Sequence, residues 1–302
     1  MRSFQLLVNP ASGGGTAARS VVPVARLLRD VGARVEVTYS PGPDRCRAVV
    51  EEAVAQGHVV VAVGGDGMVA SLAGTIVESG GLLGIIPSGR GNDFARQLGL
   101  SAEPDEAAAT LLKAEPGVVD VIDVAGRVVV GSVYAGVDSR ASELVNHAHG
   151  LPGSLQYPYA TLRALATYKP ASYRVEVDGA VHEHRAATVV VANSGYYGKG
   201  MHIAPVADPR DGLLDVIVIG AASRWQLVRS LPKLYEGSHL ELDEVTVLRG
   251  RSVSIAAAER VMAYGDGELL APLPVTATVR PGALQVVAGV DSVAMKWLGT
   301  GP

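Results

Sequence analysis

The first third of the chain alternates short apolar runs with longer segments of helical character. Runs such as Val59–Val63 are strand-sized and rich in β-branched residues, and Gly32 and Gly57 stand where the intervening helices should end. This alternation is typical of βαβ units, whose parallel strands are buried on both faces. It predicts an α/β domain with a doubly wound sheet. The expected strands are Phe4–Val8, Arg34–Tyr39, Val59–Val63 and Leu82–Ile86, and the expected helices are Thr16–Val31, Asp44–Gln56 and Met68–Ser79.

After about Asp120 the apolar runs are mostly separated by turns, which predicts an antiparallel β-rich second domain. Two helices are expected within it, Ser154–Thr167 and Arg224–Glu236, and we expect their apolar faces to pack on the core. A final helix is expected over Asp291–Leu298. The expected strands are Val128–Val133, Ser172–Val177, Ala187–Ala192, Leu214–Ile219, Val245–Leu248, Ser252–Ala256 and Val275–Arg280.

Composition limits the classes of function. The chain has 302 residues, 48% of them hydrophobic, so it can bury a core of two ordinary domains. Lys and Arg total 26 against 30 Asp and Glu, so the chain has no global positive field for nucleic acid. The single Cys46 cannot form an internal disulfide, which favours a reducing compartment, the cytoplasm. Neither a signal peptide nor an apolar stretch of bilayer length is visible.

Three glycine-rich loops follow three of the expected parallel strands. They are Asn9–Gly15, Gly64–Gly67 and Pro87–Asp93. Ligands of open α/β sheets bind at the carboxyl ends of the strands, where glycines let backbone amides approach phosphate oxygens. The negative charge of Asp66 repels phosphate, so this residue is expected to reach a metal ion or a water bound to one. Any one loop alone could be a tight turn, but the three together predict a nucleotide site.

The glycine-rich segments do not fit well to either of two better-known phosphate-binding patterns. A Walker loop ends in Gly-Lys-Ser/Thr, and no lysine follows the glycine clusters. Gly13–Ala18 formally satisfies the dinucleotide pattern, with Glu36 near the spacing of a ribose ligand. The fit is weak because Asn9–Ser12 separates the strand from the glycines.

Two acidic turns lie in the second half of the chain. Tyr264–Glu268 places Asp266 and Glu268 on one turn, and Asp266 could accept a proton from a substrate hydroxyl. Asp-Gly is also a common hairpin turn, which is the simpler alternative. The second turn, Asp208–Asp215, has hard oxygen ligands that suit Mg²⁺ or Ca²⁺, although it also suits a plain loop.

Five separated motifs, in this order, resemble the soluble bacterial diacylglycerol kinases, a family that includes the sphingosine and ceramide kinase catalytic domains. The resemblance runs from Phe4 to about Val287. It implies an α/β domain over residues 1–122, a C-terminal antiparallel β-sandwich for the lipid over residues 123–283, and ATP in the cleft between them, with the tail from about residue 284 to 302 packing back on the first domain. The motifs are Asn9–Gly13, Gly64–Gly67, Leu83–Arg96, Ala204–Asp215 and Tyr264–Glu268.

The resemblance also implies roles for individual residues. Asp266 matches the proton acceptor of the family, and Glu268 stands beside it in a Mg²⁺-linked network that includes Asp66. Asp208, Asp211 and Leu213 fall where some bacterial members hold a structural magnesium. The residues expected to line the nucleotide site are Asn9, Pro10, Ala11, Ser12, Gly13, Thr38, Gly64, Gly65, Asp66, Gly67, Met68, Val69, Ala70 and Ser71.

The chain departs from the family's pattern at two places. The family continues its nucleotide loop as Gly-Asp-Gly-Thr-x-Asn-Glu, whereas this chain has Met68, Ala70 and Ser71, which removes a hydroxyl, an amide and a carboxylate. Arg90 replaces the threonine of the Gly-Thr-Gly-Asn motif. We expect this arginine to join the nucleotide site by pairing with a phosphate.

The function expected from motifs and resemblance is an ATP- and Mg²⁺-dependent lipid kinase that converts diacylglycerol to phosphatidic acid. Its partner is then a lipid acceptor at the membrane surface, reached from the cytoplasm by transient peripheral contact, and no nucleic acid is involved. A homodimer is left open. The alternatives are an NAD kinase, which shares the Gly-Gly-Asp-Gly loop, and a catalytically silent nucleotide- or lipid-binding regulator, suggested by Met68–Ser71.

Overall fold

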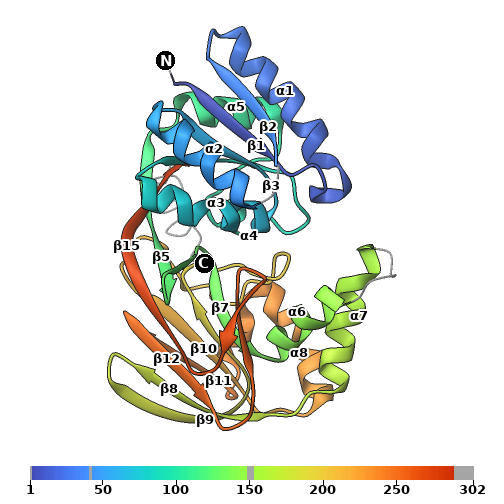
Figure 1. The fold of residues 1–302 in the computed structure, drawn as a ribbon. Helices are drawn as coiled ribbons and strands as arrows, with labels where there is room; N and C mark the ends of the chain where they lie inside the picture. The colour runs from blue at the N-terminus through green and yellow to red at the C-terminus, as the bar shows by residue number, and fades with distance from the viewer. Residues whose placement is uncertain (1, 41–42, 148–152, 289–302) are drawn as a thin grey trace, which may run out of the picture. The chain divides into compact units, whose positions relative to one another are not determined.

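The computed structural model describes residues 2–40, 43–147 and 153–288. The chain divides between Val121 and Ile122, and again between Arg280 and Pro281, into two compact units (Figure 1). The chain passes from one unit to the other within two strands, β5 (Pro116–Val124) and β15 (Val275–Val287). The end of β15 pairs in parallel with β4 of the first unit, with Gln285 opposite Leu82.

The first unit is the expected α/β domain. Its strands pair in the order β15-β4-β3-β1-β2, and these pairings are parallel. Every residue of β1 and β3 is buried, because helices cover both faces of the sheet. The elements are β1 (Phe4–Val8), the 3₁₀ turn η1 (Ser12–Gly14), α1 (Thr16–Asp30), β2 (Val35–Tyr39), α2 (Pro43–Ala55), β3 (Val59–Gly64), α3 (Asp66–Ser79), β4 (Leu82–Pro87), α4 (Asp93–Gln97) and α5 (Pro104–Lys113).

Helix α1 shows why the local sequence was enough to predict the helices and strands of this unit. Val21, Val24 and Leu28 recur at helical spacing and are buried against the sheet and α5, while the helix ends before Gly32, whose φ of 86° favours glycine. The expected strands and helices of this unit are confirmed to within a few residues. Helices α4 and α5 were not predicted.

The second unit is built from antiparallel strands. The first half of β9 pairs with β8, and its second half pairs with β7 and β10. Alternate residues of these strands, such as Val189 and Val191, are fully buried and form the core. The strands are β6 (Arg127–Val129), β7 (Ser132–Gly136), β8 (Ala171–Val177), β9 (Ala180–Ala192), β10 (Leu214–Gly220), β11 (Val245–Gly250), β12 (Ser252–Ala257), β13 (Met262–Gly265) and β14 (Glu268–Pro272).

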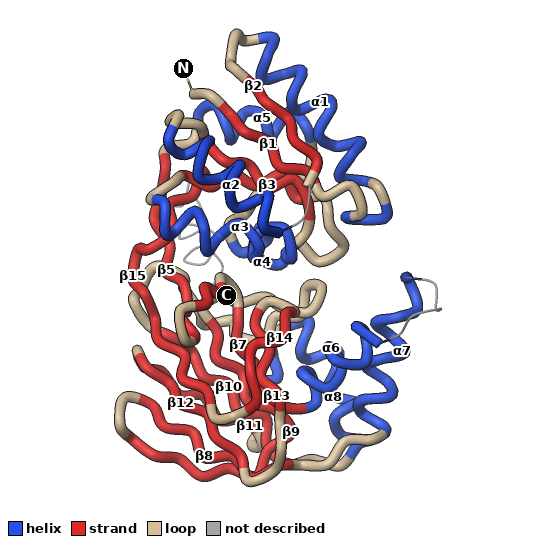
Figure 2. The backbone as a smooth tube through the Cα atoms, in the orientation of Figure 1, coloured by secondary structure: helices blue, strands red, loops and turns tan. Residues whose placement is uncertain are grey.

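Three helices gather beside the strands of this second unit (Figure 2). They are α6 (Val137–His147), α7 (Gly153–Ala166) and α8 (Arg224–Glu236), and a 3₁₀ turn, η2 (Ser238–Glu241), follows α8. Helix α7 buries Ala160, Ala164 and Leu165, as expected. Helix α8 buries none of its residues completely, but the half-buried Leu234 packs against the core cluster that contains Tyr134 and Ile217, so the expectation that its apolar face packs on the core is confirmed only in part. Helix α6 was not predicted.

One expected strand is divided in two. The run Val128–Val133 was expected to be continuous, but β6 ends at Val129 and β7 begins at Ser132. The backbone amides of Val130 and Gly131 turn toward the side chain of Asp266 instead of a neighbouring strand. The helix expected over Asp291–Leu298 lies outside the described residues.

Candidate functional site

The three glycine-rich loops of the first unit lie side by side. Because β1, β3 and β4 are neighbouring parallel strands, their following loops leave the same edge of the sheet. The amide of Asn9 donates to the carbonyl of Val63 at 3.1 Å, and that of Ser88 donates to the carbonyl of Gly64 at 2.8 Å. The expected placement of the loops on one edge is therefore confirmed.

Two of these loops touch backbone to backbone. A Cβ atom added to Gly89 would lie 2.3 Å from the Cα atom of Gly65, far inside van der Waals contact. Asn92 closes its own loop over this point, since its Oδ1 accepts the amide of Gly89 at 2.8 Å. Only a glycine at position 89 lets the two loops approach so closely.

The loop after β1 is short and folded on itself. Asn9 Oδ1 accepts the amide of Ala11 at 3.0 Å, and Ser12–Gly14 forms a 3₁₀ turn that leads into α1. On the neighbouring strand, Thr38 Oγ1 accepts a hydrogen bond from Nε2 of the buried Gln5 at 3.0 Å. The predicted nucleotide residues Asn9–Gly13 and Thr38 thus come from adjacent strands of the sheet.

Asp66 is the first residue of α3, directly after Gly65. Its Oδ1 accepts the amide of Phe94 at 3.2 Å, at the start of α4. Burial raises the pKa of this carboxyl, while hydrogen bonds from the backbone at Phe94, Asp93 and Asn92 act in the opposite direction. Asp66 therefore joins α3 to α4, a contact that the sequence did not predict, and its metal-binding role stays a prediction.

The residues after Asp66 differ in what they expose. Met68 and Val69 are buried, Ala70 is half-buried, and Gly67 and Ser71 are exposed. The Ser71 hydroxyl donates to the Met68 carbonyl at 2.9 Å. The amides of Met68 and Val69 both donate to the carbonyl of Gly65, at 2.9 and 3.3 Å. The nucleotide contacts predicted for these residues stay predictions.

Asp266 lies in the hairpin turn between β13 and β14. Asp266 and Gly267 have φ values of 48° and 89°, as a two-residue turn with both central residues in the left-handed region requires. The simpler alternative from the sequence, a hairpin turn, is therefore confirmed as the local structure. Glu268 follows as the first, exposed residue of β14. A turn of this kind does not exclude catalysis, because it also presents the Asp266 side chain.

Three consecutive backbone amides hold the Asp266 carboxylate. Its Oδ2 accepts the amide of Val130 at 2.7 Å, and its Oδ1 accepts those of Gly131 and Ser132 at 2.9 and 3.2 Å. A carboxylate has about four acceptor positions, so these bonds fix its orientation. These amides were not predicted from the sequence, although a glycine within a β-rich run is a signal of close backbone approach.

The segment that carries these amides is itself anchored to the end of β9. Asn193 Nδ2 donates to the carbonyl of Val130 at 2.9 Å, and the amides of Asn193 and Ser194 donate to that of Gly131 at 2.9 and 3.1 Å. Asn193 and Ser194 are fully buried. The orientation of Asp266 is thus set by two distant parts of the chain.

The resemblance implies that Asp266 is the proton acceptor, and on that expectation Gly131→Ala should reduce turnover at least about tenfold. The added Cβ would lie 2.7 Å from Asp266 Oδ1 and must displace the carboxylate, and an error of about 1 Å in a reacting group costs up to about 10²-fold. Steady-state kinetics would measure this. Ser132→Ala is the matched control, because the Ser132 hydroxyl has no hydrogen-bond partner in the described part of the chain and its amide is retained. Equal turnover in both variants would contradict the prediction.

A second polar group of this unit, centred on Asp138, was not predicted from the sequence. Asp138, at the start of α6, accepts hydrogen bonds from the hydroxyls of Thr188 at 2.6 Å and Tyr197 at 3.3 Å. Burial raises the pKa of Asp138 to about 6. The ring of Tyr134 contacts the rings of Tyr197 and Tyr264, which connects this group to β13, the strand that precedes Asp266.

The predicted magnesium residues lie in the loop before β10. Asp208 forms a bidentate ion pair with Arg210, with both N···O distances 2.8 Å, and Asp211 pairs with Arg249 and accepts the amide of Leu213. Within the described ranges no group of three or more His, Cys, Asp and Glu residues is placed to hold a metal ion. The role of Asp208, Asp211 and Leu213 stays a prediction.

Arg249 also reaches a deeper carboxyl. Its Nε lies 3.4 Å from Oδ1 of Asp215, whose side chain is only 3% exposed. Burial raises the pKa of Asp215 to about 6, and the Arg249 charge opposes this shift. Arg249 on β11 therefore supplies the positive charge beside two of the loop's carboxylates.

Two family models match the chain, one in each of its two halves. The diacylglycerol kinase catalytic domain matches residues 3–124, and the YegS C-terminal NAD kinase beta sandwich-like domain matches residues 131–288. These segments contain the glycine-rich loops and the Asp266 hairpin, respectively.

Individual relatives cover nearly the whole chain. The chain is 35% identical to a diacylglycerol kinase of Mycobacterium tuberculosis (strain H37Rv) over 298 residues, 93% of each chain. It is 24% identical to a diacylglycerol kinase of Bacillus subtilis (strain 168) over 283 residues, 91% of this chain and 92% of that one. A crystal structure of a diacylglycerol kinase from Bacillus anthracis has a similar fold, with a TM-score of 0.75 at 21% identity over 95% of this chain and 97% of that one. The chain is therefore a member of the family of diacylglycerol kinases and YegS-like lipid kinases, and is a kinase.

Proposed function

We propose that this kinase transfers the γ-phosphate of ATP to a lipid hydroxyl, with diacylglycerol as acceptor and phosphatidic acid as product. The observation that carries the proposal is the meeting of three glycine-rich loops at the carboxyl edge of a parallel sheet, where backbone amides can bind a triphosphate. The names of the relatives support diacylglycerol as acceptor.

The chemical step needs one proton acceptor. The lipid hydroxyl oxygen forms a bond to the γ-phosphorus, the bond from that phosphorus to the β–γ bridging oxygen breaks, and ADP leaves. The hydroxyl proton passes to the carboxylate of Asp266. Hydrogen bonds from three backbone amides hold this carboxylate in one orientation.

The Asp66 carboxylate would supply one hard oxygen ligand to a magnesium ion beside the phosphate-binding loops. Burial raises the pKa of this carboxyl. Asp66 would hold the ion directly or through water, and bound Mg²⁺ would neutralise charge on the phosphates. The arginine-paired Asp208 and Asp211 have no part in this proposal.

Labelled ATP, incubated with a panel of diacylglycerol, monoacylglycerol, ceramide, sphingosine and NAD, tests the proposal directly. Label is expected in phosphatidic acid. Label in NADP would replace the proposal with an NAD kinase, and measurable ATP binding without transfer to any acceptor would indicate a nucleotide-binding regulator. Label in a different lipid would keep the reaction and change the acceptor.

Arg90→Ala should raise the Michaelis constant for ATP about tenfold, because a hydrogen bond to a charged group contributes about 1.5–3 kcal/mol. Turnover should change little, because the contact with the phosphate is made equally in the bound ground state and in the transition state. Arg90 is exposed in the loop that touches Gly64 and Gly65. Arg26→Ala, on an exposed face of α1, is the charge-matched control. An unchanged Michaelis constant would exclude the phosphate contact.

A lipid acceptor requires that the protein reach a membrane. In the described segments no helix has both the length and the apolar character needed to cross a bilayer. We propose peripheral contact at the membrane surface as the way in which the acceptor is reached.

A further inference from the structure

Helix α8 is the least covered helix of the second unit. No residue of α8 is buried, although it contains Trp225, Leu227, Val228, Leu231, Leu234 and Tyr235. Trp225 is 77% exposed and Tyr235 is 52% exposed, and Trp225 is the most exposed large hydrophobic residue in the described part of the chain. Exposed apolar residues are informative where they are grouped, and here two large aromatic residues are exposed on one helix.

The outer face of α8 combines this tryptophan with positive charge. Trp225, Arg229 and Lys233 follow one another at intervals of four residues, so they share one face of the helix. All three residues are exposed. Arg224 adds a third cation, and the only acid on the helix is Glu236 in its last turn.

The helix is held rigidly at both ends. At its start the Ser223 hydroxyl accepts the amide of Gln226 at 3.2 Å, and the Gln226 side chain accepts the amide of Ser223 at 2.9 Å, which together form a capping box. At its end Gly237 adopts a left-handed conformation with a φ of 80°. The exposed face is therefore presented by an ordered helix.

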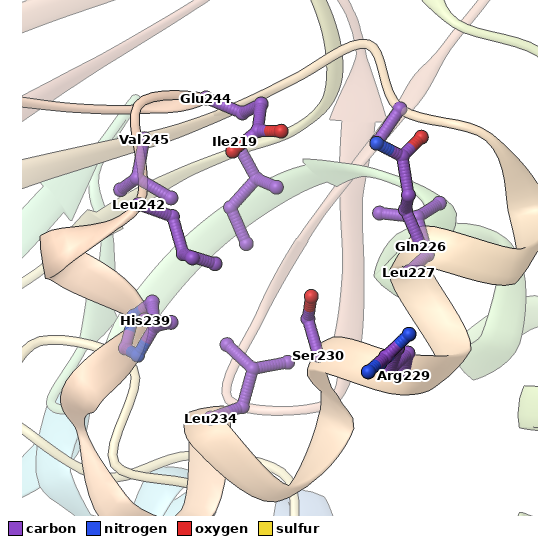
Figure 3. Close-up of a pocket in the computed structure, with 11 residues that line it drawn as sticks. Ile219, Gln226, Leu227, Arg229, Ser230, Leu234, His239, Leu242, Glu244 and Val245 are labelled. Carbon is purple, nitrogen blue, oxygen red and sulfur yellow. The ribbon is translucent and has the colours of Figure 1, made fainter.

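The inner side of α8 covers a pocket at the edge of the core, against which Leu234 packs. The pocket has a volume of about 140 Å³ and lies between α8, η2 and strands β10 and β11 (Figure 3). Leu227 and Leu234 of α8 face Ile219, Leu242 and Val245 across it, and Arg229 stands at its edge (Figure 3). Incomplete packing under the helix explains why its leucines are only half-buried.

We propose that α8 is the membrane-contact element of this kinase and lies on a bilayer that contains anionic phospholipid. Tryptophan is favoured at the membrane–water interface, and Lys and Arg beside it extend to anionic headgroups. The acids Glu241, Asp243 and Glu244 follow the helix, so the positive charge is confined to α8 itself. The inference rests on the proposed function in one respect, that the acceptor lies in a bilayer.

Trp225 provides its own probe. The chain has two tryptophans, Trp225 and Trp297, so Trp297→Phe leaves Trp225 as the only indole. Its emission is expected to shift to shorter wavelength with vesicles of phosphatidylcholine and phosphatidylglycerol, less with phosphatidylcholine alone, and less at high salt. No shift with either vesicle would overturn the proposal.

Sedimentation with the same vesicles tests the charged face. The double variant Arg229→Glu and Lys233→Glu should weaken binding at least tenfold, because each basic group near an anionic surface contributes to the attraction. Arg26→Glu on α1, whose side chain is 82% exposed, is the control and should bind like the parent chain. If the α8 variants change the oligomeric state in lipid-free solution and leave vesicle binding intact, α8 is a protein interface and the proposal is wrong.

Two acceptors separate this inference from the proposed function. With a short-chain diacylglycerol dissolved as monomers, Trp225→Ala should retain parent turnover, whereas with long-chain diacylglycerol in vesicles its activity should fall at least tenfold. Equal loss on both acceptors would assign Trp225 to the folded core or the reaction instead of the membrane. If the parent chain phosphorylates neither acceptor, the proposed function fails, and the vesicle measurements still decide the role of α8.

Discussion

Asp266→Asn should lower turnover by at least about 10²-fold while ATP still binds, since removing a positioned general base typically costs about 10²–10⁴-fold. The substitution keeps the shape of the side chain and removes its capacity to accept a proton. Turnover with saturating diacylglycerol and ATP affinity by calorimetry are the two measurements. Near-normal turnover would exclude Asp266 as the proton acceptor.

The same substitution also has a structural cost, which needs its own control. An asparagine amide group would meet an N–H donor of Val130 or Gly131, and a buried donor left without an acceptor costs about 1–3 kcal/mol. Asp178 is a close match, because Asp178 and Gly179 form a turn with φ values of 48° and 88°, and the Asp178 carboxylate accepts the amides of Arg251 and Ser252 at 2.8–3.0 Å.

Asp178→Asn disturbs the same kind of contact where the hydrogen bonds are exposed to water, so it should lower stability by no more than Asp266→Asn and leave turnover unchanged. Thermal unfolding and kinetics of both variants separate the two effects. A parallel loss of turnover in Asp178→Asn would show that the Asp266 result reports stability alone.

Gly89→Ala should lower kcat/KM at least about 10²-fold, because its Cβ cannot fit 2.3 Å from the Cα of Gly65 and one loop must move by about 1 Å or more. The atom in the way belongs to the backbone of Gly65, so the clash cannot be relieved by moving a flexible side chain. We therefore also expect a loss of about 1–3 kcal/mol in the free energy of unfolding. ATP binding by calorimetry and chemical denaturation measure the two effects.

Gly67→Ala is the matched control for the stability arm of this experiment. A Cβ at Gly67 meets no atom within 4 Å, and the residue lies in the first turn of α3. Its stability should be unchanged or raised by about 0.5–1 kcal/mol, since alanine is the better helix former. An intact ATP affinity in Gly89→Ala would show that the two loops do not have to touch for nucleotide binding.

Much of the first unit was accessible from the sequence because its signals are local. The helix Thr16–Asp30 was predicted from a repeat of apolar residues and a following glycine, and both lie within one stretch of chain. The three phosphate-type loops were also predictable, because parallel neighbouring strands necessarily end on one edge. The hairpin turn at Asp266 and Gly267 was identified by its two residue types.

Other expectations failed or were incomplete where distant segments decide the outcome. The apolar pattern of Arg224–Glu236 predicts a helix, but whether a helix is covered depends on the elements beside it, and here they leave a pocket. The acidic turn at Asp208–Asp215 suggests a cation, and the structure brings Arg249 to it from β11.

In the Asp266 hairpin, the local sequence determined one part of the site and the tertiary structure determined the other. The local sequence determined the turn and the carboxylate, because both follow from an Asp-Gly pair between two short strands. Only the tertiary structure brought the amides of Val130, Gly131 and Ser132, more than 130 positions away in the chain, to that carboxylate. Backbone amides exist at nearly every residue and leave no mark in the sequence, so which of them meet a side chain is decided by the pairing of distant strands.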